Sequence, residues 1–519
     1  MANRKGGVIA AGHEQTALAA QMILDEGGNA FDAAVAAHLA ACIAEPVLAS
    51  LAGGGFLLAR TSGRRNILYD FFVQTPLRKR KGDVEFYPIT GNFGETVQEF
   101  HIGAGSVATP GTVKGLFAIH RDLCTMPMDE LAQPAMDMGR NGVKMNHFQA
   151  YILEIIKPIY VATPGAVAIY GSPGGKGLIK EGEWFRQPEL AETIEALAHE
   201  GEDLFYRGEL AKKISRVCSE HGSHLSADDL DQYEVTRREP LEVTYRDNHI
   251  LTNPAPSSGG MLIAFALKLL EEIPANTRSR TAGNGDWLHL LAGIQEMTDR
   301  ARIDDASGSE NGHPSAGLLD SRLLKVYREQ IRNNPRFSRG TTQISIIDRD
   351  GNMAALSASN GEGSGLVVPG TGVMLNNMLG EEDLNPGGFD KWACNRRMTS
   401  MMAPSILLMP DNRSVALGSG GSNRLRTAIL QVILNLTDRG MAPVEAVNHP
   451  RIHYENGLLS AENGFSAADL DDLLREYPVH KVWNGKNLFF GGVHVAGRSG
   501  KNFIGAGDPR RGGVAVTAG

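Results

Sequence analysis

A short segment in the second half of the chain constrains the fold more than any other stretch. Residues 340 to 348 begin at a Gly-Thr pair and continue with alternating side chains, and the sequence Asp-Gly-Asn at residues 350 to 352 follows as a hairpin-type turn. Threonine and isoleucine favour strands because branched side chains pack well on a pleated surface. The pattern predicts a strand that begins abruptly at Thr341 and ends in a turn.

Thr341 could act as a nucleophile if it became an N-terminus. A threonine hydroxyl inside a chain is a weak nucleophile, but an N-terminal threonine carries its own base, since an α-amine has a pKa of about 8. Cleavage between Gly340 and Thr341 would create this arrangement, and residues 306 to 340 have the Ser-, Gly-, Asn- and Arg-rich composition of an exposed, cleavable connection. Taken alone, the segment also fits an ordinary strand after a flexible loop.

Length and charge limit the classes of protein to consider. With 519 residues, the chain should form either two to three domains or one large layered domain. The formal net charge is −8, and the only dense basic cluster, residues 78 to 81, is short and followed by acids. A nucleic acid is therefore not the expected partner.

The N-terminal region and the cysteines predict the compartment. Four widely spaced cysteines form neither a CxxC pair nor a disulfide framework, so we expect reduced thiols. Polar residues at positions 13 to 15 interrupt any apolar run of signal-peptide length. The Ala-rich stretch from 28 to 44 contains Asn29, Asp32 and His38, which favour a buried helix over a membrane span. We expect a cytoplasmic protein without a membrane partner.

Two weak motifs do not predict a cofactor or a metal. Residues 103 to 108 match the GxGxxA dinucleotide fingerprint, but a proline and a glycine at 110 and 111 would fall in the first turns of the required helix. His221 and His224, with the acids at 228 and 229, lack a recognised ligand spacing. We therefore expect neither a cofactor nor a metal ion.

The order of elements predicts a layered α/β fold. The N-terminal part reads as a strand at 8 to 11, a helix at 14 to 25, a second, Ala-rich helix ending near 45, and a hairpin whose return strand is 67 to 72. The middle, from about 108 to 330, reads as mainly helical, with one helix at 261 to 271. Residues 341 to 519 return to short strands and glycine turns.

Two polar segments in the last third could bind substrate. Consecutive glycines in Gly418-Ser419-Gly420-Gly421 follow a strand and could direct backbone N–H groups at a developing oxyanion, although a plain strand-to-helix turn has the same composition. Thr399 and Ser400 could bind a substrate carboxylate or merely close a turn.

Together, these segments resemble the γ-glutamyltranspeptidases, the glutathione hydrolase family of N-terminal nucleophile hydrolases. GGNAFDAAVAAHLAACIAEP and LAGGGFLL are similar to the family's GGNAVDAA and GGGGF segments, and VATPGTVKGL, SADDLDQYEV and NPAPSSGG follow in the family's order. TTQISIIDRDGN is similar to TTHYSVVDKDGN, and GAGDPR stands near the end. The resemblance extends over most of the chain.

The resemblance implies a four-layer αββα fold that is made as a proenzyme and splits itself into residues 1–340 and 341–519, which stay associated as one unit. It also implies a role for each matching residue. The implied roles are Thr341 as nucleophile at the Gly340–Thr341 cleavage site, Thr342 as the family's second threonine, Ser359 at the threonine that contacts the nucleophile, Asn360 near a substrate-binding asparagine, Thr399 and Ser400 as carboxylate ligands, and Gly420 and Gly421 at the oxyanion hole.

Departures from the family pattern concern the substrate. Glu381 aligns with an aspartate that binds the α-amino group of the substrate, and Met378 offers no comparable hydrogen bond. The family's carboxylate-binding arginine has no clear match, and Arg80 or Arg78 is the candidate here.

The leading hypothesis is an acyltransferase or hydrolase that cleaves γ-glutamyl amides through an acyl ester on Thr341 and uses no cofactor. A relative acting on another small acyl amide, such as a glutaryl-cephalosporin or oxamate, stays open, as does an unprocessed protein that only binds amino acids or peptides. A serine hydrolase based on Ser257 or Ser258 is disfavoured, since no His-Asp partners are identifiable. The expected partners are a small amide substrate and the second fragment, with a larger homo-oligomer left open.

Overall fold

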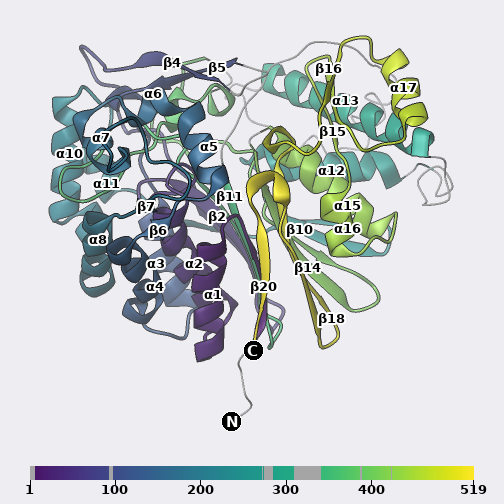
Figure 1. Ribbon diagram of the computed structural model, residues 1–519, viewed down its shortest axis with the longest axis horizontal. Coiled ribbons are helices and arrows are strands. Elements are labelled where there is room, and N and C mark those ends of the chain that lie inside the picture. The colour runs from purple at the N-terminus through teal and green to yellow at the C-terminus, as the bar shows by residue number, and fades with distance from the viewer. Residues whose placement is uncertain are drawn as a thin grey trace.

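Two antiparallel sheets stack face to face between two layers of helices (Figure 1). The computed structural model describes residues 6–92, 97–271, 273, 284–308, 341–385, 388–421 and 423–519. The layer order is the predicted αββα arrangement. Both sheets combine strands from before and after residue 340, so the two predicted fragments share one core.

The first sheet is built around the strand predicted from the TTQISIID segment. That strand, β11, lies between β1 and β12, with Thr342 opposite Ala358 and Ile347 opposite Val8. The strands, in spatial order, are β20 (Val514–Ala518), β1 (Gly7–Ala11), β11 (Thr342–Asp348), β12 (Met353–Ser359), β2 (Gly54–Arg60), β3 (Asn66–Phe71) and β8 (Thr236–Arg238).

The second sheet packs on the first through β14 and β18, which contact β11 (Figure 1). Its residues on the face towards the first sheet, such as Ala416 and Ala496, belong to the same buried apolar cluster as Val8 and Phe56 of the first sheet. The strands, in spatial order, are β19 (Asn502–Ala506), β18 (Gly492–Ser499), β14 (Arg413–Gly420), β13 (Ser405–Leu408), β10 (Asn248–Thr252) and β9 (Leu241–Tyr245).

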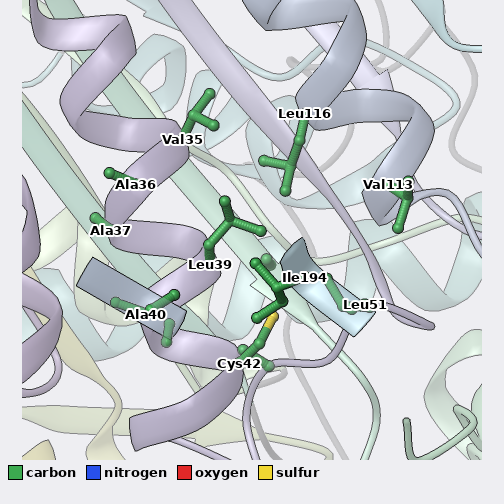
Figure 2. Packing of buried hydrophobic residues seen from close by; sticks show 14 of the residues in the cluster. Val35, Ala36, Ala37, Leu39, Ala40, Cys42, Leu51, Val113, Leu116 and Ile194 are labelled. Atoms are coloured by element: carbon green, nitrogen blue, oxygen red, sulfur yellow. The ribbon is translucent and has the colours of Figure 1, made fainter. Parts of the chain in front are cut away.

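The helical layer over the first sheet depends on the Ala-rich helix α2, all of whose residues are buried. Asn29 and Asp32 form a capping box at its start, and its small side chains let β11 and neighbouring helices approach closely. Figure 2 shows Leu39 of α2 beside Leu116 and Ile194. The helices of this side are α1 (Glu14–Glu26), α2 (Ala30–Ala44), α3 (Thr112–Leu123), α4 (Met128–Asn141), α5 (His147–Ile155), α6 (Lys157–Tyr160), α7 (Pro164–Tyr170), α8 (Pro188–Glu200), α9 (Asp203–Tyr206), α10 (Glu209–Glu220) and α11 (Ala227–Asp231).

The opposite helical layer covers the second sheet, with α15 against β14 and α12 against β9. Its helices are α12 (Ser258–Glu271), α13 (Asn284–Gly308), α15 (Arg424–Thr437), α16 (Pro443–Asn448) and α17 (Ala467–Glu476). Smaller elements are the strands β4 (Tyr87–Asn92), β5 (Val97–Ile102), β6 (Val143–Lys144), β7 (Trp184–Phe185), β15 (Ile452–Glu455), β16 (Leu458–Glu462) and β17 (His480–Trp483), and the 3-10 turns η1 (Ala104–Ser106), η4 (Met378–Gly380), η5 (Glu382–Leu384), η6 (Leu488–Phe490) and η7 (Pro509–Arg511).

The sequence-based elements agree with the structure near the N-terminus and differ in the middle. The predicted helix at 14 to 25 is α1, and the predicted return strand at 67 to 72 is β3. The mainly helical interpretation of the middle missed β8, β9 and β10, which lie between residues 236 and 252. Their alternation is short and half-exposed, and they become strands by pairing with β3 and β13.

The four cysteines are all unpaired, as predicted. Within the described ranges, no helix combines the length and the apolar composition needed to span a membrane. The same ranges hold no group of three or more His, Cys, Asp or Glu side chains able to hold a metal ion.

The packing in Figure 2 gives a stability prediction. Replacing buried Leu39 with alanine should lower the free energy of unfolding by about 3 kcal/mol, because the dense helical layer closes poorly over the lost atoms. The matched control is Leu18→Ala in α1, where the side chain is 42% exposed and the expected loss is below about 0.5 kcal/mol. Urea unfolding of both variants measures the difference, and equal losses would contradict this account of the layer.

Candidate active site

Thr341 and Thr342 lie on opposite faces of the first sheet. Side chains alternate along a strand, and in β11 Gln343 and Ser345 face the second sheet while Ile344 packs among the helices. Continuing this alternation places the Thr341 side chain between the sheets and the Thr342 side chain towards α2. Both residues are buried, with 4% and 2% of their surface exposed. Gly340, on the other side of the predicted cleavage site, lies outside the described residues.

A buried carboxylate holds Thr342. The Thr342 hydroxyl donates to Glu45 Oε2 at 2.7 Å, and the Thr16 hydroxyl donates to Glu45 Oε1 at 2.7 Å. Burial raises the pKa of Glu45, although the two hydroxyl donors oppose the shift. Gly12 leaves room for this contact, because a Cβ there would lie 2.8 Å from Glu45 Oε2. Glu45 therefore sets the position of the residue next to the predicted nucleophile.

Ser359 ends β12 on the same face as Thr341. The β11–β12 register pairs Thr342 with Ala358, and one further step places Thr341 opposite Ser359. The Ser359 hydroxyl accepts a hydrogen bond from the Gly361 N–H at 3.0 Å. The structure therefore brings these two predicted site residues together.

Asn360 follows Ser359 and is fully buried. Neither its amide oxygen nor its amide nitrogen has a hydrogen-bond partner within the part of the chain that the structure describes. Leaving a buried amide without partners costs free energy, and a bound ligand can supply them. Asn360 thus carries a buried amide that a ligand could satisfy, and its role in substrate binding stays a prediction.

Glu381 lies beside Gly361, the residue that follows Asn360. The Glu381 carboxylate accepts from Asn377 Nδ2 at 2.9 Å, and a Cβ on Gly361 would lie 3.2 Å from Glu381 Oε1. Asn377 Oδ1 in turn accepts from the N–H of Glu362 at 2.9 Å. The loop that carries Glu381 is tied to the turn after β12, so an amine-binding carboxylate there would have a fixed position.

The predicted oxyanion glycines meet Thr341 from the second sheet. Gly420 ends β14, and a Cβ on it would lie 2.1 Å from the Thr341 carbonyl oxygen, so only glycine fits. Gly421 has a φ of 127°, a conformation that strongly favours glycine. The pair lies beside the predicted nucleophile, and its oxyanion role stays a prediction.

Thr399 and Ser400 pack against the loop that precedes α12. The Thr399 hydroxyl donates to the Pro256 carbonyl at 2.9 Å, and the Ser400 carbonyl accepts from the Ser257 hydroxyl at 2.7 Å. The Ser258 hydroxyl also donates to the Ser400 carbonyl, at 3.2 Å, so both serine hydroxyls form structural hydrogen bonds. Carboxylate binding by Thr399 and Ser400 stays a prediction.

Arg80 is exposed, and its contacts lie away from Thr341. Its guanidinium donates to the Ser219 carbonyl at 3.2 Å, and its backbone N–H donates to His224 Nδ1 at 3.0 Å. Both partners belong to the region of α10 and α11. Among the described residues, Arg80 forms no hydrogen bond or ion pair with those around Thr341, so its assignment rests on the sequence alone.

Sequence reasoning missed a buried charge network behind the glycine pair. Asp508 accepts from Arg451 at 2.6 Å and from Arg510 at 3.2 Å, and Arg510 also donates to Glu462 at 2.7 Å. Burial alone would raise the pKa of Asp508, but the two guanidinium groups outweigh burial and lower it. His494 also contacts Asp508, accepting from its N–H, and burial lowers the His494 pKa to about 4.

Two sequence signals could have found these residues. The Glu-Pro pair that ends the GGNAFDAA segment contains Glu45, and the GAGDPR motif contains Asp508 and Arg510. Both motifs supported the resemblance, but neither indicates which charged side chains contact each other in the folded protein. Thr342 is 297 residues from Glu45 in sequence, and Arg451 is 57 residues from Asp508.

Comparison with known proteins decides the family. The family model described as Gamma-glutamyltranspeptidase matches residues 16–518. The chain belongs to the γ-glutamyltranspeptidase family. It is therefore an enzyme of that family, an amidohydrolase, and the predicted family membership is confirmed.

Relatives in the γ-glutamyltranspeptidase family divide between two activities. The chain is 30% identical to "Glutathione hydrolase proenzyme" of Escherichia coli strain K12, over 86% of this chain and 80% of the relative. It is also 30% identical to "Acylase ACY 1 proenzyme" of Pseudomonas sp. strain SE83, over 92% of this chain and 87% of the relative. Sequence identity does not separate the two classes.

Solved structures confirm the α/β fold. The cephalosporin acylase from Bacillus halodurans superposes with a TM-score of 0.83 at 23% identity, covering 99% of this chain and 96% of that one. A γ-glutamyltranspeptidase chain from Pseudomonas nitroreducens matches with a TM-score of 0.52 at 27% identity, covering 62% of this chain and 92% of that one.

The charge network behind Gly420 and Gly421 gives a pH prediction. Asp508→Asn should lower the free energy of unfolding at pH 7 by about 3 kcal/mol, because it leaves two buried guanidinium groups without their shared carboxylate. The Asp508 pKa is lowered in the folded state, so its contribution is present above the unfolded pKa and is lost as pH falls through the folded value. The difference from wild type should therefore shrink below about pH 4.

Urea unfolding at several pH values between 3 and 7 measures this difference. Asp411→Asn is the control, since Asp411 is an exposed carboxylate paired with Arg413 and should contribute less than about 1 kcal/mol. A pH-independent loss in Asp508→Asn would show that packing rather than charge is responsible.

Proposed function

We propose that this γ-glutamyltranspeptidase family member cleaves itself before Thr341 and then hydrolyses or transfers γ-glutamyl groups from small amides. The observation that carries the proposal is the meeting of Thr341 and Ser359 from the first sheet with Gly420 from the second. Support also comes from the proenzyme names of relatives in both activity classes.

The proposed reaction uses an acyl-enzyme. The Thr341 hydroxyl attacks the substrate carbonyl, its proton passes to the free α-amine, and the N–H groups at Gly420 and Gly421 stabilise the oxyanion. Collapse of this intermediate breaks the C–N bond and transfers the proton to the leaving amine. Water or a second amine then attacks the ester and releases Thr341. The same hydroxyl first attacks the Gly340 carbonyl during maturation.

Recognition of the acyl group rests on Asn360 and Glu381. Asn360 supplies a buried amide whose polar atoms lack partners in the described chain, and Glu381 supplies a carboxylate suited to an α-ammonium group. We propose that this pair selects γ-glutamyl over uncharged acyl groups. We also propose a cytoplasmic location, which rests on the sequence features alone.

A second candidate is an acylase for a small dicarboxylic acyl amide such as a glutaryl-cephalosporin. The observation that favours it is Met378, whose side chain is buried in the apolar cluster that contains residues of both sheets. Met378 thus adds no contact for an α-amine, so ammonium recognition depends on fewer groups. The split among relatives supports the same alternative.

Removing the Thr341 hydroxyl tests the proposed nucleophile. Thr341→Ala should leave a single chain of 55.8 kDa and reduce amidase activity by at least about 1,000-fold, because both steps need this oxygen. Intact mass and N-terminal sequencing of each fragment measure processing. Thr341→Ser, which keeps a hydroxyl, is the matched control and should still yield a fragment beginning at residue 341. Normal cleavage in the alanine variant would remove Thr341 as nucleophile, and an uncleaved wild type would favour the binding-protein alternative.

Glu381 tests the choice between the two substrate classes. If Glu381 binds the α-ammonium, Glu381→Gln should lower kcat/KM for γ-glutamyl-p-nitroanilide by about 10- to 100-fold, the value of a hydrogen bond to a charged group. The rate with glutaryl-p-nitroanilide, which lacks the amine, should change little. A wild type that hydrolyses both anilides equally, with no selective loss in the variant, would favour the acylase.

A further inference from the structure

A buried guanidinium group lies beside the two glycines that face Thr341. Arg511, at the end of η7, has 4% of its surface exposed. Its Nη1 lies 3.2 Å from the point that a Cβ on Gly420 would occupy, and the Thr341 carbonyl oxygen lies 2.1 Å from that point. Its Nη2 lies 3.3 Å from the corresponding point on Gly421. A positive charge is thus close to the predicted nucleophile.

The Arg511 side chain makes no hydrogen bond and no ion pair with any residue that the structure describes. Its Nε is enclosed and has no hydrogen-bond partner there. The preceding residue, Arg510, is in the opposite situation, since it donates to Glu462 and Asp508 and to the carbonyl oxygens of Val447 and His449. A buried charge without a partner is costly unless a ligand pairs with it.

The charges around Arg511 do not neutralise it. Asp508 is already bonded to Arg451 and Arg510, and Glu362 attracts Arg511 without forming an ion pair of 4.0 Å or less. Burial and the neighbouring Arg424 lower the Arg511 pKa to about 10, so the group is still protonated at neutral pH. The helix α15 begins at Arg424, shortly after Gly420 and Gly421, and its N-terminus adds positive potential near Arg511.

The fold also makes room for this side chain. A Cβ on Gly492 would lie within 2.8 Å of Arg511 Cβ, Cγ and Cδ, so the arginine stem crosses β18 where that strand has no side chain. Gly420 and Gly421 leave the guanidinium end clear in the same way. Three glycines therefore permit the approach of Arg511 to the site.

We propose that Arg511 binds a carboxylate of the amide substrate close to the scissile bond. The inference rests on the proposed amidase function and adds a binding residue to it. A planar guanidinium suits a carboxylate because the two can form parallel hydrogen bonds. The carboxylate belongs either to the acyl part or to the amine part of the substrate. One experiment distinguishes these two positions.

The experiment compares wild type with Arg511→Gln on three anilides. Butyryl-p-nitroanilide has no carboxylate, glutaryl-p-nitroanilide has one on the acyl part, and butyryl-3-carboxy-4-nitroanilide has one on the amine part. The variant should lose about 100-fold in kcat/KM only with the substrate whose carboxylate Arg511 binds, since a charged hydrogen bond in a buried site is lost. Arg511→Lys keeps the charge and should recover part of the loss.

Each outcome bears on the proposal. Selective loss with the glutaryl substrate supports binding of an acyl carboxylate, and selective loss with the carboxyanilide supports binding of an amine carboxylate. Equal losses with all three substrates, or no loss with any, would overturn the proposal. Failure of the proposed function is distinguishable, because wild type would then show neither a fragment starting at Thr341 nor hydrolysis of any anilide.

A stability measurement separates Arg511 from its structural neighbour. Arg511→Gln should keep the wild-type thermal midpoint or raise it, because it removes a buried charge without a protein partner. Arg510→Gln is the matched control and should lower the midpoint, because it breaks bonds to Glu462 and Asp508. A similar drop in both variants would indicate that Arg511 stabilises the fold and would count against a ligand-binding role.

Discussion

The position of β11 between β1 and β12 is the constraint on which the rest of the site depends. Because side chains alternate along this strand, one threonine turns towards the helices and the other towards the second sheet. The hydrogen bond from Thr342 to Glu45 stabilises that register from the helical side, 297 residues away in sequence. A slip of one residue would exchange the two faces and move the predicted nucleophile out of the space between the sheets.

The second sheet places Gly420 and a buried charge network on the side of Thr341 that faces away from the helices of the first sheet. Gly420 approaches the Thr341 carbonyl so closely that no side chain fits, and the buried ion pairs of Asp508 lie behind the same strand ends. Buried charges of this kind contribute little net stability compared with apolar packing, but removing one partner is costly. The network therefore holds the C-terminal segment, and with it Arg511, in one arrangement beside the glycine pair.

Much of the site could be predicted from the sequence because its parts are short local patterns. The TTQISIID alternation predicted the strand, and the glycines after β14 marked a candidate oxyanion hole. The sequence did not single out Arg511 as a candidate for binding a carboxylate, since Arg80 and Arg511 are the same residue type and differ only in burial and in hydrogen-bond partners. The strands β8 to β10 were missed for a related reason, because their pairing partners lie elsewhere in the chain.

The sequence by itself determined the family, the threonine pair and the residue types available for acyl transfer. These follow from ordered motifs, and each motif carries its own local chemistry. Only the tertiary structure decided which charges meet: that Glu45 holds Thr342, that Asp508 joins Arg451 to Arg510, and that Arg511 stays without a protein partner in the described chain. The physical reason is that burial and pairing are properties of contacts between distant segments, which the packing of the two sheets creates.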